Sequence, residues 1–247
     1  MLSNNITFKG FSLKPKKFNQ NLKKTKSAFN SFLMEFKNFE IPLLQSYEKK
    51  YELDFTKDLI KKFSKYKNIF LIGMGGSILG TKSIYSFLKK KISKKVFFFD
   101  NLDENLHFQF NKIKSLKNSC FIIVSKSGNT LETIVNFNIV SSKLSLKNKL
   151  VFITEIKDSS LVNLADRYSA EIIEHKNFIG GRYSVLSEAG MFPAALMGLE
   201  IDKFKNLERL IKNKNFVFSL IKNVASIYTL NLQGFNNSVI LNYDSNL

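Results

Sequence analysis

Short apolar segments alternate with helical patterns through the middle of the chain. The segment Cys120–Val124 is apolar without alternation, and Asn68–Ile72 is another short apolar run, so both predict buried strands of a parallel sheet. Across this region we predict strands near residues 68–73, 95–100, 120–125 and 150–154, with a weaker one near 170–173. Strands that alternate with helices in this way indicate an α/β fold, a doubly wound parallel sheet covered on both faces.

Helical patterns also flank this region. Apolar residues recur at helical spacing between Ser27 and Glu52, which predicts a helical arm, whereas residues 1–25 are basic and polar with no clear period. Residues 202–233 predict one or two helices, with four side chains expected in the core: Phe216, Phe218, Leu220 and Ile221. We therefore divide the chain into a helical arm (1–60), an α/β domain (61–200) and a C-terminal segment (201–247).

The stretch Ser125–Thr133, here called the hydroxyl loop, follows a predicted strand and precedes a helix start. Its hydroxyl groups, a lysine and a glycine stand where the backbone N–H groups of a turn and of a helix N-terminus point at one spot. Such a place stabilises a phosphate dianion, and hydroxyl side chains add hydrogen bonds to its oxygens. The alternative is that Ser127 or Asn129 caps a helix that begins near Thr130.

A second predicted strand runs into Gly73–Gly80, here called the glycine loop. Its glycines do not fit the dinucleotide pattern G-x-G-x-x-G, because Ile78 stands three positions after Gly75, so a nicotinamide cofactor has little support. No G-x-x-x-x-G-K-[ST] run occurs, which leaves nucleoside triphosphate binding without support. What the loop offers is a backbone that a small ligand can approach closely, with the Ser77 hydroxyl beside it.

The third segment, Gly180–Ser187, is here called the arginine segment, and a predicted helix packed against the sheet follows it. Only three of the 38 Lys and Arg residues are Arg, and Arg182 directly follows two glycines. A planar, permanently charged guanidinium group suits an anionic intermediate or a phosphate. The alternative is a surface or structural ion pair.

Together, in this order, the three segments resemble the phosphoglucose isomerase family. The glycine loop is similar to G-x-G-G-S-x-L-G, the hydroxyl loop to S-K-[ST]-x-x-T-x-E-T, and the arginine segment to G-G-R-[FY]-S-V-L-S. The hydroxyl loop alone would suit any sugar isomerase (SIS) domain, so the arginine segment is what distinguishes this family. The resemblance covers residues 60–200 most strongly and implies a sheet of the SIS type.

The resemblance implies an aldose–ketose isomerase that interconverts glucose 6-phosphate and fructose 6-phosphate through a cis-enediolate, without a metal or an organic cofactor. In such an enzyme a carboxylate base moves a proton between C1 and C2, and a cation stabilises the charge on oxygen. By position, Arg182 matches the residue that stabilises the enediolate. Substrate and phosphate contacts are implied for Gly76, Ser77, Ser125, Lys126, Ser127, Thr130, Thr133 and Gly181.

The chain departs from the family in the proton-transfer part of the site. In the family the carboxylate base belongs to a downstream G-E-P-G-x-N-x-x-H stretch, which does not occur here, and neither does the ring-opening histidine motif or the lysine near the C-terminus. We interpret His107 and His175 as ordinary surface or turn residues. Glu132 and Glu188 are not base candidates by position, and Glu132 is expected to stabilise a helix N-terminus through its charge.

The C-terminal end of the sequence predicts the start of a second SIS domain. Ser238–Leu241 has the composition of a buried strand, which in the family opens that domain, and the sequence ends soon after it. A lone apolar strand exposes unpaired backbone groups, so the 247-residue chain is expected to aggregate or to bind another polypeptide. A homodimer is expected for the full-length protein.

The net charge of +18 would ordinarily suggest a nucleic-acid partner, but composition argues against one. Lys, Asn, Phe and Ile are abundant while Arg, Trp and Pro are scarce, a pattern typical of an A/T-rich coding sequence, and the basic residues are spread along the chain. No long apolar run or signal-peptide pattern occurs, and the single Cys120 cannot form an internal disulfide. A cytoplasmic protein with no membrane partner is therefore expected.

Two other function classes stay open. A stand-alone SIS-type sugar-phosphate sensor would keep the hydroxyl loop and dispense with the base, although the arginine segment counts against it. A split enzyme would be completed by a second polypeptide that carries the missing motif.

Overall fold

The computed structural model describes residues 16–38, 40–48, 50–103, 108, 110, 116–142, 146, 149–205 and 207–239. Contacts within the chain divide it into two units, one made of residues 1–48 and 206–243 and the other of residues 49–205 and 244–247. The larger unit contains a sheet, and the described residues of the smaller one are mainly helical.

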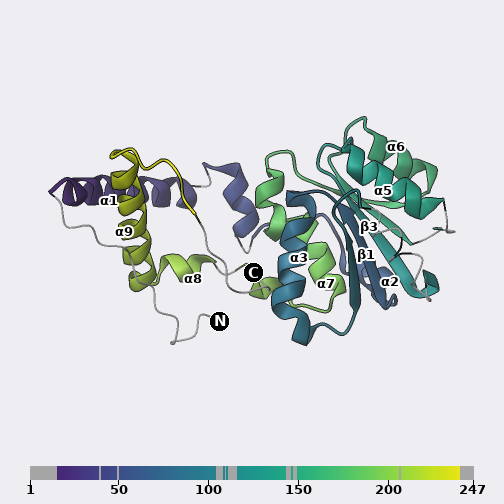
Figure 1. The fold of residues 1–247 in the computed structure, drawn as a ribbon. Helices are drawn as coiled ribbons and strands as arrows, with labels where there is room; N and C mark the ends of the chain where they lie inside the picture. Colours follow the sequence, from purple (N-terminus) through teal and green to yellow (C-terminus); the bar gives the residue numbers. More distant parts are fainter. Residues whose placement is uncertain are drawn as a thin grey trace. The chain divides into compact units, whose positions relative to one another are not determined.

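The larger unit is built on a five-stranded parallel sheet with the strand order β2-β1-β3-β4-β5 (Figure 1). Its strands lie at the five positions predicted from the sequence, which are therefore confirmed. Their bounds are β1 Asn68–Gly73, β2 Lys95–Phe99, β3 Ser119–Val124, β4 Leu150–Thr154 and β5 Glu171–Glu174.

The central strands are buried on both faces because their alternate side chains enter two separate hydrophobic clusters. On β1, Ile69 and Leu71 pack in one cluster, whereas Phe70 and Ile72 pack in the other. Every residue of β1 and β3 is buried. This two-sided burial explains why the two strands lack apolar–polar alternation in the sequence.

Helices cover both faces of the sheet, as the α/β prediction requires (Figure 1). Residues of α2, α3 and α7 belong to the first hydrophobic cluster, and residues of α5 and α6 belong to the second. These helices are α2 Lys57–Ser64, α3 Gly76–Leu88, α5 Leu131–Ser141, α6 Ser160–Arg167 and α7 Glu188–Leu196. Short 3₁₀ helices are η2 Lys89–Lys91, η3 Leu116–Asn118, η4 Gly181–Leu186 and η5 Ile201–Lys203.

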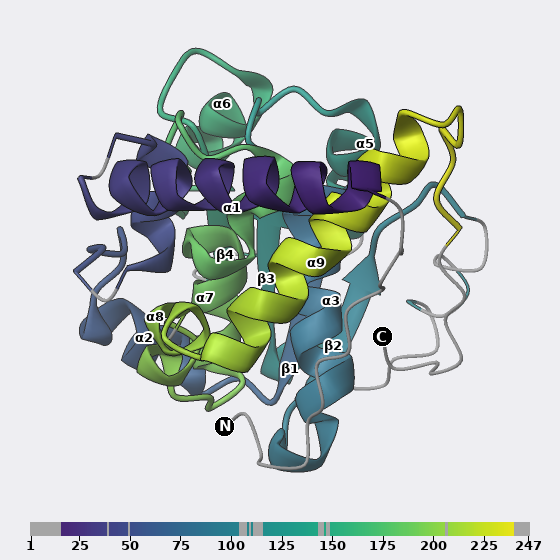
Figure 2. The same cartoon turned by 90° about the vertical axis from the view of Figure 1, so that its left-hand side faces the viewer.

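In the smaller unit, two helices far apart in sequence pack against each other (Figure 2). They are α1 Lys16–Lys37 and α9 Lys214–Asn231, and the unit also contains η1 Pro42–Tyr47 and α8 Leu207–Ile211. Their interface is partly polar, because Asn21 Nδ2 donates to Thr229 Oγ1 at 3.0 Å and both residues are buried.

Two predictions for the flanking helices are wrong in part. The first helix begins at Lys16, within the region that showed no period, because the polar Asn21 occupies its buried side and hides the apolar pattern. In α9, Ile221 is buried as predicted, but Phe218 is 57% exposed and Leu220 is 37% exposed. The buried side of α9 is formed largely by small and polar residues: Ser219, Ala225, Ser226 and Thr229.

The strand predicted at the C-terminal end lies mostly outside the described residues. Ser238 and Val239, the last two described residues, have no regular secondary structure. The prediction of a strand over residues 238–241 therefore stays a prediction.

Candidate functional site

The strand order reverses beside β1, because β2 lies on one side of it and β3 on the other. In open α/β sheets, ligands bind at such a reversal, outside the carboxyl ends of the strands. The glycine loop leaves β1 and the hydroxyl loop leaves β3 at this edge. A Cβ atom placed on Gly73 would lie 2.9 Å from the carbonyl oxygen of Val124, so the two loops start side by side.

Three hydroxyl groups of the hydroxyl loop converge just before α5. Ser125 Oγ and Thr130 Oγ1 are 2.8 Å apart, and Ser127 Oγ lies 3.5 Å from each of them. Ser125 is buried and Ser127 is exposed, so the group extends from the sheet edge to the surface. These hydroxyls and the N–H groups in the first turn of α5 can together hydrogen-bond the oxygens of a phosphate group.

Neither side chain of the capping alternative caps α5. The helix begins at Leu131, and no side-chain hydrogen bond caps its N-terminus. Ser127 Oγ accepts a hydrogen bond from the N–H of Asn129 at 3.3 Å. Asn129 Oδ1 instead accepts one from the N–H of Ser160 at 2.8 Å, at the start of α6. The first turn of α5 is thus left with N–H groups that no side-chain cap occupies.

Gly128 allows the tight path of the hydroxyl loop. Its φ of +72° lies in the left-handed region that favours glycine, and a Cβ atom there would lie within 3.0 Å of the Ser159 side chain. Thr133 lies further along, inside α5, where it is 1% exposed. Its Oγ1 has no hydrogen-bond partner in the described part of the chain. Thr133 is thus as buried as Ser125, but its hydroxyl group lies outside the cluster of three converging hydroxyls.

The lysine of the hydroxyl loop is held from two sides. Lys126 Nζ donates to the carbonyl oxygen of Asn177 at 2.6 Å and lies 3.5 Å from Glu155 Oε1. Glu155 also forms an ion pair with Lys157. The hydrogen bond from Lys157 and the charge of Lys126 lower the pKa of Glu155 below its ordinary value. A charged carboxylate therefore stands beside Lys126 at neutral pH.

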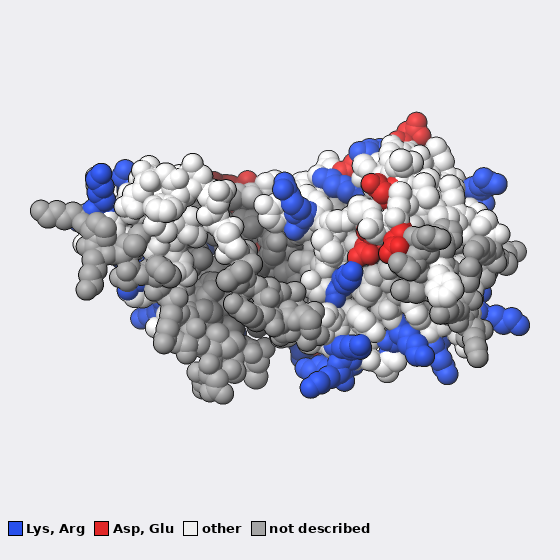
Figure 3. Space-filling view, viewed as in Figure 1, with Lys and Arg blue, Asp and Glu red and all other residues white. Residues whose placement is uncertain are grey.

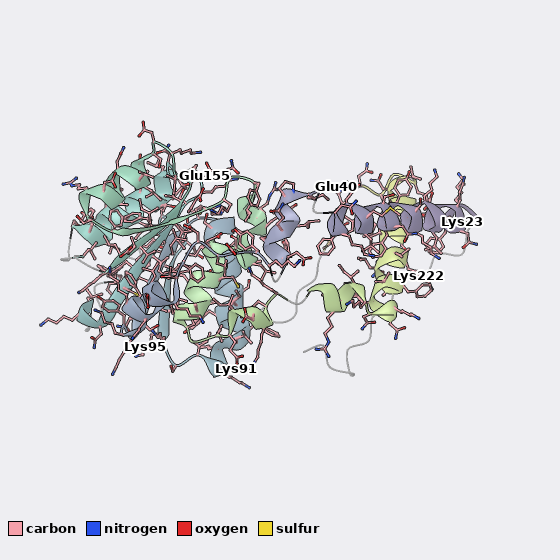
Figure 4. All side chains as sticks on the ribbon, turned by 180° about the vertical axis from the view of Figure 1, so that it is seen from behind. Lys23, Glu40, Lys91, Lys95, Glu155 and Lys222 are labelled. Carbon is pink, nitrogen blue, oxygen red and sulfur yellow. The ribbon has the colours of Figure 1, made fainter. Side chains whose placement is uncertain are left out.

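Glu155 lies at the same edge of the sheet as the two loops. It directly follows β4, whereas Lys95 opens β2. Figure 4 shows these two labelled residues at opposite ends of the sheet. The Glu155–Lys126 pair thus belongs to the candidate site at the carboxyl ends of the strands.

The arginine segment lies directly against the glycine loop. A Cβ atom on Gly76 would lie within 3.0 Å of the carbonyl group of Gly181 and of the backbone N of Arg182. Ser184 Oγ donates to the carbonyl oxygen of Gly181 at 2.8 Å and lies 3.3 Å from that of Gly76. The two glycines at which close approach was predicted are therefore in contact with each other.

Residues 175–179, here called the crossing segment, carry the chain from the sheet edge to this contact. The segment leaves β5, the edge strand, and the chain reaches β1 at Gly181, three strands away. The segment contains a turn, in which the N–H of Ile179 donates to the carbonyl oxygen of Lys176 at 3.1 Å. On the way it meets the hydroxyl loop, where Asn177 accepts the hydrogen bond from Lys126.

Arg182 is exposed beside these loops. Within the described residues it forms no ion pair, so the alternative of a structural ion pair has no support there. Its backbone is fixed by the Gly76 contact, and its guanidinium group is open to an anion.

The prediction that His175 is a surface or turn residue is wrong. His175 follows β5 and is 0% exposed, its Nδ1 is 3.2 Å from the carbonyl oxygen of Lys176, and its Nε2 has no partner in the described part of the chain. Burial lowers the pKa of His175 below its ordinary value, so the imidazole is neutral. The sequence carries no periodic signal for this position, and His107 lies outside the described residues.

Sequence reasoning also missed the surroundings of Glu188, at the start of α7. Its buried carboxylate accepts hydrogen bonds from the Tyr51 hydroxyl at 2.8 and 3.0 Å and from the N–H of Asp54 at 3.2 Å. Burial raises the pKa of Glu188 above its ordinary value. Glu188 thus connects the chain around Tyr51 and Asp54, before α2, to the end of the arginine segment, so its role is structural.

The described residues give little support for a metal site, a membrane span or a nucleic-acid surface. No group of three or more His, Cys, Asp or Glu side chains among them is placed to hold a metal ion. None of the helices described is both long and apolar enough to cross a membrane. The Lys and Arg side chains of the larger unit lie at several separate places on the face in Figure 3 rather than in one patch.

Comparison with known proteins finds a family model that matches most of the chain. The family model described as phosphoglucose isomerase matches residues 60–247. The glucose-6-phosphate isomerase of Methanocaldococcus jannaschii is 32% identical over 203 residues, which cover 77% of this chain and 49% of that protein. The glucose-6-phosphate isomerase of Acholeplasma laidlawii is 31% identical over 230 residues, covering 84% of this chain and 52% of that protein.

Two solved structures are similar in fold to this chain. A glucose-6-phosphate isomerase from Chlamydia trachomatis superposes with a TM-score of 0.52 and 26% identity, over 60% of this chain and 29% of that one. A hypothetical protein from Thermus thermophilus shares the fold with a TM-score of 0.60 and 19% identity, over 86% of this chain and 52% of that one. The chain thus spans about half the length of the curated relatives named above.

Proposed function

Because the chain belongs to the phosphoglucose isomerase family, we propose that it forms the phosphate-binding part of a glucose-6-phosphate isomerase. The enzyme interconverts glucose 6-phosphate and fructose 6-phosphate. The observation that carries the proposal is the meeting of all three motif segments at the reversal of strand order. There the converging hydroxyls of Ser125, Ser127 and Thr130 adjoin a free helix N-terminus.

Each group has a role in this proposal. The hydroxyl loop and the first turn of α5 bind the phosphate group of the sugar, with Thr133 contributing if α5 shifts on binding. Ser77, with the backbone of Gly76 and Gly181, faces the sugar, and Lys126 supplies a positive charge near it. Arg182 stabilises the negative oxygen of the cis-enediolate through two parallel N–H groups.

The proton transfer needs a base that removes the C2 proton of the open-chain aldose and returns a proton to C1. No G-E-P-G-x-N-x-x-H stretch occurs among the 247 residues, so the proposal assigns the base to residues outside them. Glu188 does not serve as this base, because its carboxylate is occupied by Tyr51 and Asp54. The residues described here bind, orient and stabilise charge.

The proposal extends to a homodimer for the full-length protein, a cytoplasmic location and chemistry that needs no metal or organic cofactor. Sedimentation of the full-length protein tests the dimer: a sedimentation coefficient of a monomer at micromolar concentration would contradict it. Activity that survives prolonged dialysis against a chelator would support the absence of a metal.

The test of the function is turnover by the product of the complete reading frame. Fructose 6-phosphate formation from glucose 6-phosphate is measured for that product and for the 247-residue chain. The proposal expects turnover by the complete product and none by the chain alone. Phosphate-dependent sugar binding without turnover by the complete product would instead favour the sugar-phosphate sensor. The absence of the base motif from the 247 residues is the observation that favours this alternative. Turnover only after a second polypeptide is added would favour the split enzyme.

A further inference from the structure

Lys126 has two of its three N–H groups committed. An ammonium group carries three donors and no acceptor, and here one is bonded to Asn177 O while another faces Glu155 at 3.5 Å. The Lys126 side chain keeps 29% of its surface exposed. One donor therefore stays available to a ligand, and the position of the charge is already fixed before a ligand arrives.

Glu155 is linked to Lys126 through both its backbone and its side chain. The N–H of Glu155 donates to the carbonyl oxygen of Lys126 at 3.1 Å, and its carboxylate faces the Lys126 ammonium group. Lys157 holds the same carboxylate from its other oxygen. The Glu155 side chain is only 15% exposed, so solvent screens the pair less than it screens an open surface pair.

Asn177 belongs to the crossing segment that leads to Arg182. By donating to its carbonyl oxygen, Lys126 joins the hydroxyl loop to the crossing segment. The contacts from Glu155 through Lys126 to Asn177 thus tie the hydroxyl loop to the stretch of chain that leads into the arginine segment.

We propose that Glu155 is a positioning residue for Lys126, holding its ammonium group beside the hydroxyl loop with one N–H left for a sugar phosphate. This inference rests on the proposed function. A lysine side chain that is already immobilised loses less rotamer freedom when the ligand binds, so positioning by Glu155 strengthens binding although Glu155 carries the same sign of charge as phosphate.

The experiment is a double-mutant cycle on the affinity for glucitol 6-phosphate, a sugar phosphate that cannot isomerise. Calorimetry measures the dissociation constant for the unchanged chain, Glu155→Gln, Lys126→Met and the double variant. We expect Glu155→Gln to weaken binding about three- to tenfold, and to have no further effect when Lys126 is already Met. The unfolding midpoint of each variant is measured alongside.

Glu171→Gln is the matched control. Glu171 pairs with Lys62 at 2.6 Å and is the first residue of β5. It therefore lies at the amino ends of the strands, whereas the site lies at their carboxyl ends. The same loss of a lysine–glutamate pair there is expected to leave the affinity unchanged. Should Glu155→Gln not fold, Glu155→Asp replaces it in the cycle, because the shorter side chain withdraws the carboxylate by about 1.5 Å and breaks the pair.

Three results overturn the inference. If Glu155→Gln binds glucitol 6-phosphate more tightly, both with Lys126 present and with Lys126→Met, Glu155 only repels the phosphate dianion. Unchanged affinity, or a loss of equal size with and without Lys126, would remove any action through Lys126. If the unchanged chain itself binds no glucitol 6-phosphate, the proposed function fails and the inference fails with it. If the unchanged chain binds but either of the first two results is found, only the inference fails.

Discussion

Gly76 and Gly181 lie in backbone contact, although more than a hundred residues separate them in the sequence. A Cβ atom on Gly76 would lie within 3.0 Å of the Gly181 carbonyl group, a distance that real Cβ atoms do not show. A Cβ atom on Gly181 would meet nothing within 4 Å. The contact between the glycine loop and the arginine segment therefore depends on the absence of a side chain at one of its two glycines.

Gly76→Ala is expected to destabilise the chain and to displace the arginine segment, since backbone atoms rather than a flexible side chain stand in the way. Overpacking of this kind costs about 1–3 kcal/mol. Denaturation in urea measures the change in free energy of unfolding. Gly181→Ala is the control and is expected to unfold like the unchanged chain. Equal stability of both variants would contradict the contact.

Ser125→Ala and Thr130→Ala are expected to weaken binding of glucitol 6-phosphate by about 1–3 kcal/mol each, as for a lost hydrogen bond to a charged group. Calorimetry gives the two affinities. Ser141→Ala removes a hydroxyl at the far end of the same helix, where it donates to the carbonyl oxygen of Asn138, and should leave binding unchanged. An affinity loss as large in Ser141→Ala would show that the effect is not local to the phosphate.

Arg182→Lys, made in the full-length protein, is expected to lower kcat by about tenfold or more while changing KM little. Lysine keeps the charge but loses the planar pair of donors that an enediolate oxygen would use. Steady-state kinetics in both directions measure the effect. Arg167→Lys, in the last turn of α6, provides the control. Equal kcat for Arg182→Lys and the unchanged enzyme would exclude Arg182 from the chemistry.

Buried His175 predicts a loss of stability in mild acid. Burial holds its pKa below 6.5 in the folded chain, so below about pH 6.5 the unfolded chain binds the extra proton and the folded chain does not. Stability therefore falls as the pH drops from 7.5 to 5.5, by at most about 1.4 kcal/mol per pH unit from this residue. Urea denaturation across this range should show a shallower dependence in His175→Gln. The same slope in both proteins would contradict a buried, neutral His175.

Cys120 is expected to be unreactive in the folded chain. It is fully buried in β3, and burial raises the pKa of its thiol to about 12, so almost no thiolate forms at neutral pH. Iodoacetamide should alkylate it only after the chain is unfolded in urea. Rapid labelling of the native chain would mean that β3 is accessible, which contradicts its place in the core.

The strands could be predicted because burial on two faces leaves a local mark, as in Asn68–Gly73. The helix start at α5 and the acidic Glu132 in its first turn were also local signals. By contrast, the Asn21–Thr229 hydrogen bond hid the start of α1, since a polar residue on a buried face breaks the apolar period. Local pattern thus predicts elements well wherever the contacts they make are apolar.

Within the site, the motif residues could be named from the sequence, but their mutual contacts could not. The bond from Lys126 to Asn177 exists only because the crossing segment passes over neighbouring strands, and that path follows from the strand order. The burial of His175 likewise depends on what packs over the end of β5. Such relationships are tertiary, so no spacing rule within one segment reveals them.

The central claim is that a sugar phosphate binds at the hydroxyl loop, and amide chemical shifts of the ¹⁵N-labelled chain test it most directly. Glucitol 6-phosphate is titrated in, with unphosphorylated glucitol as the control. We expect saturable shifts at Ser127, Gly128 and the first turn of α5, with smaller shifts at Ser77, and none with glucitol. Equal responses to the two compounds, or shifts confined to other parts of the chain, would contradict the claim.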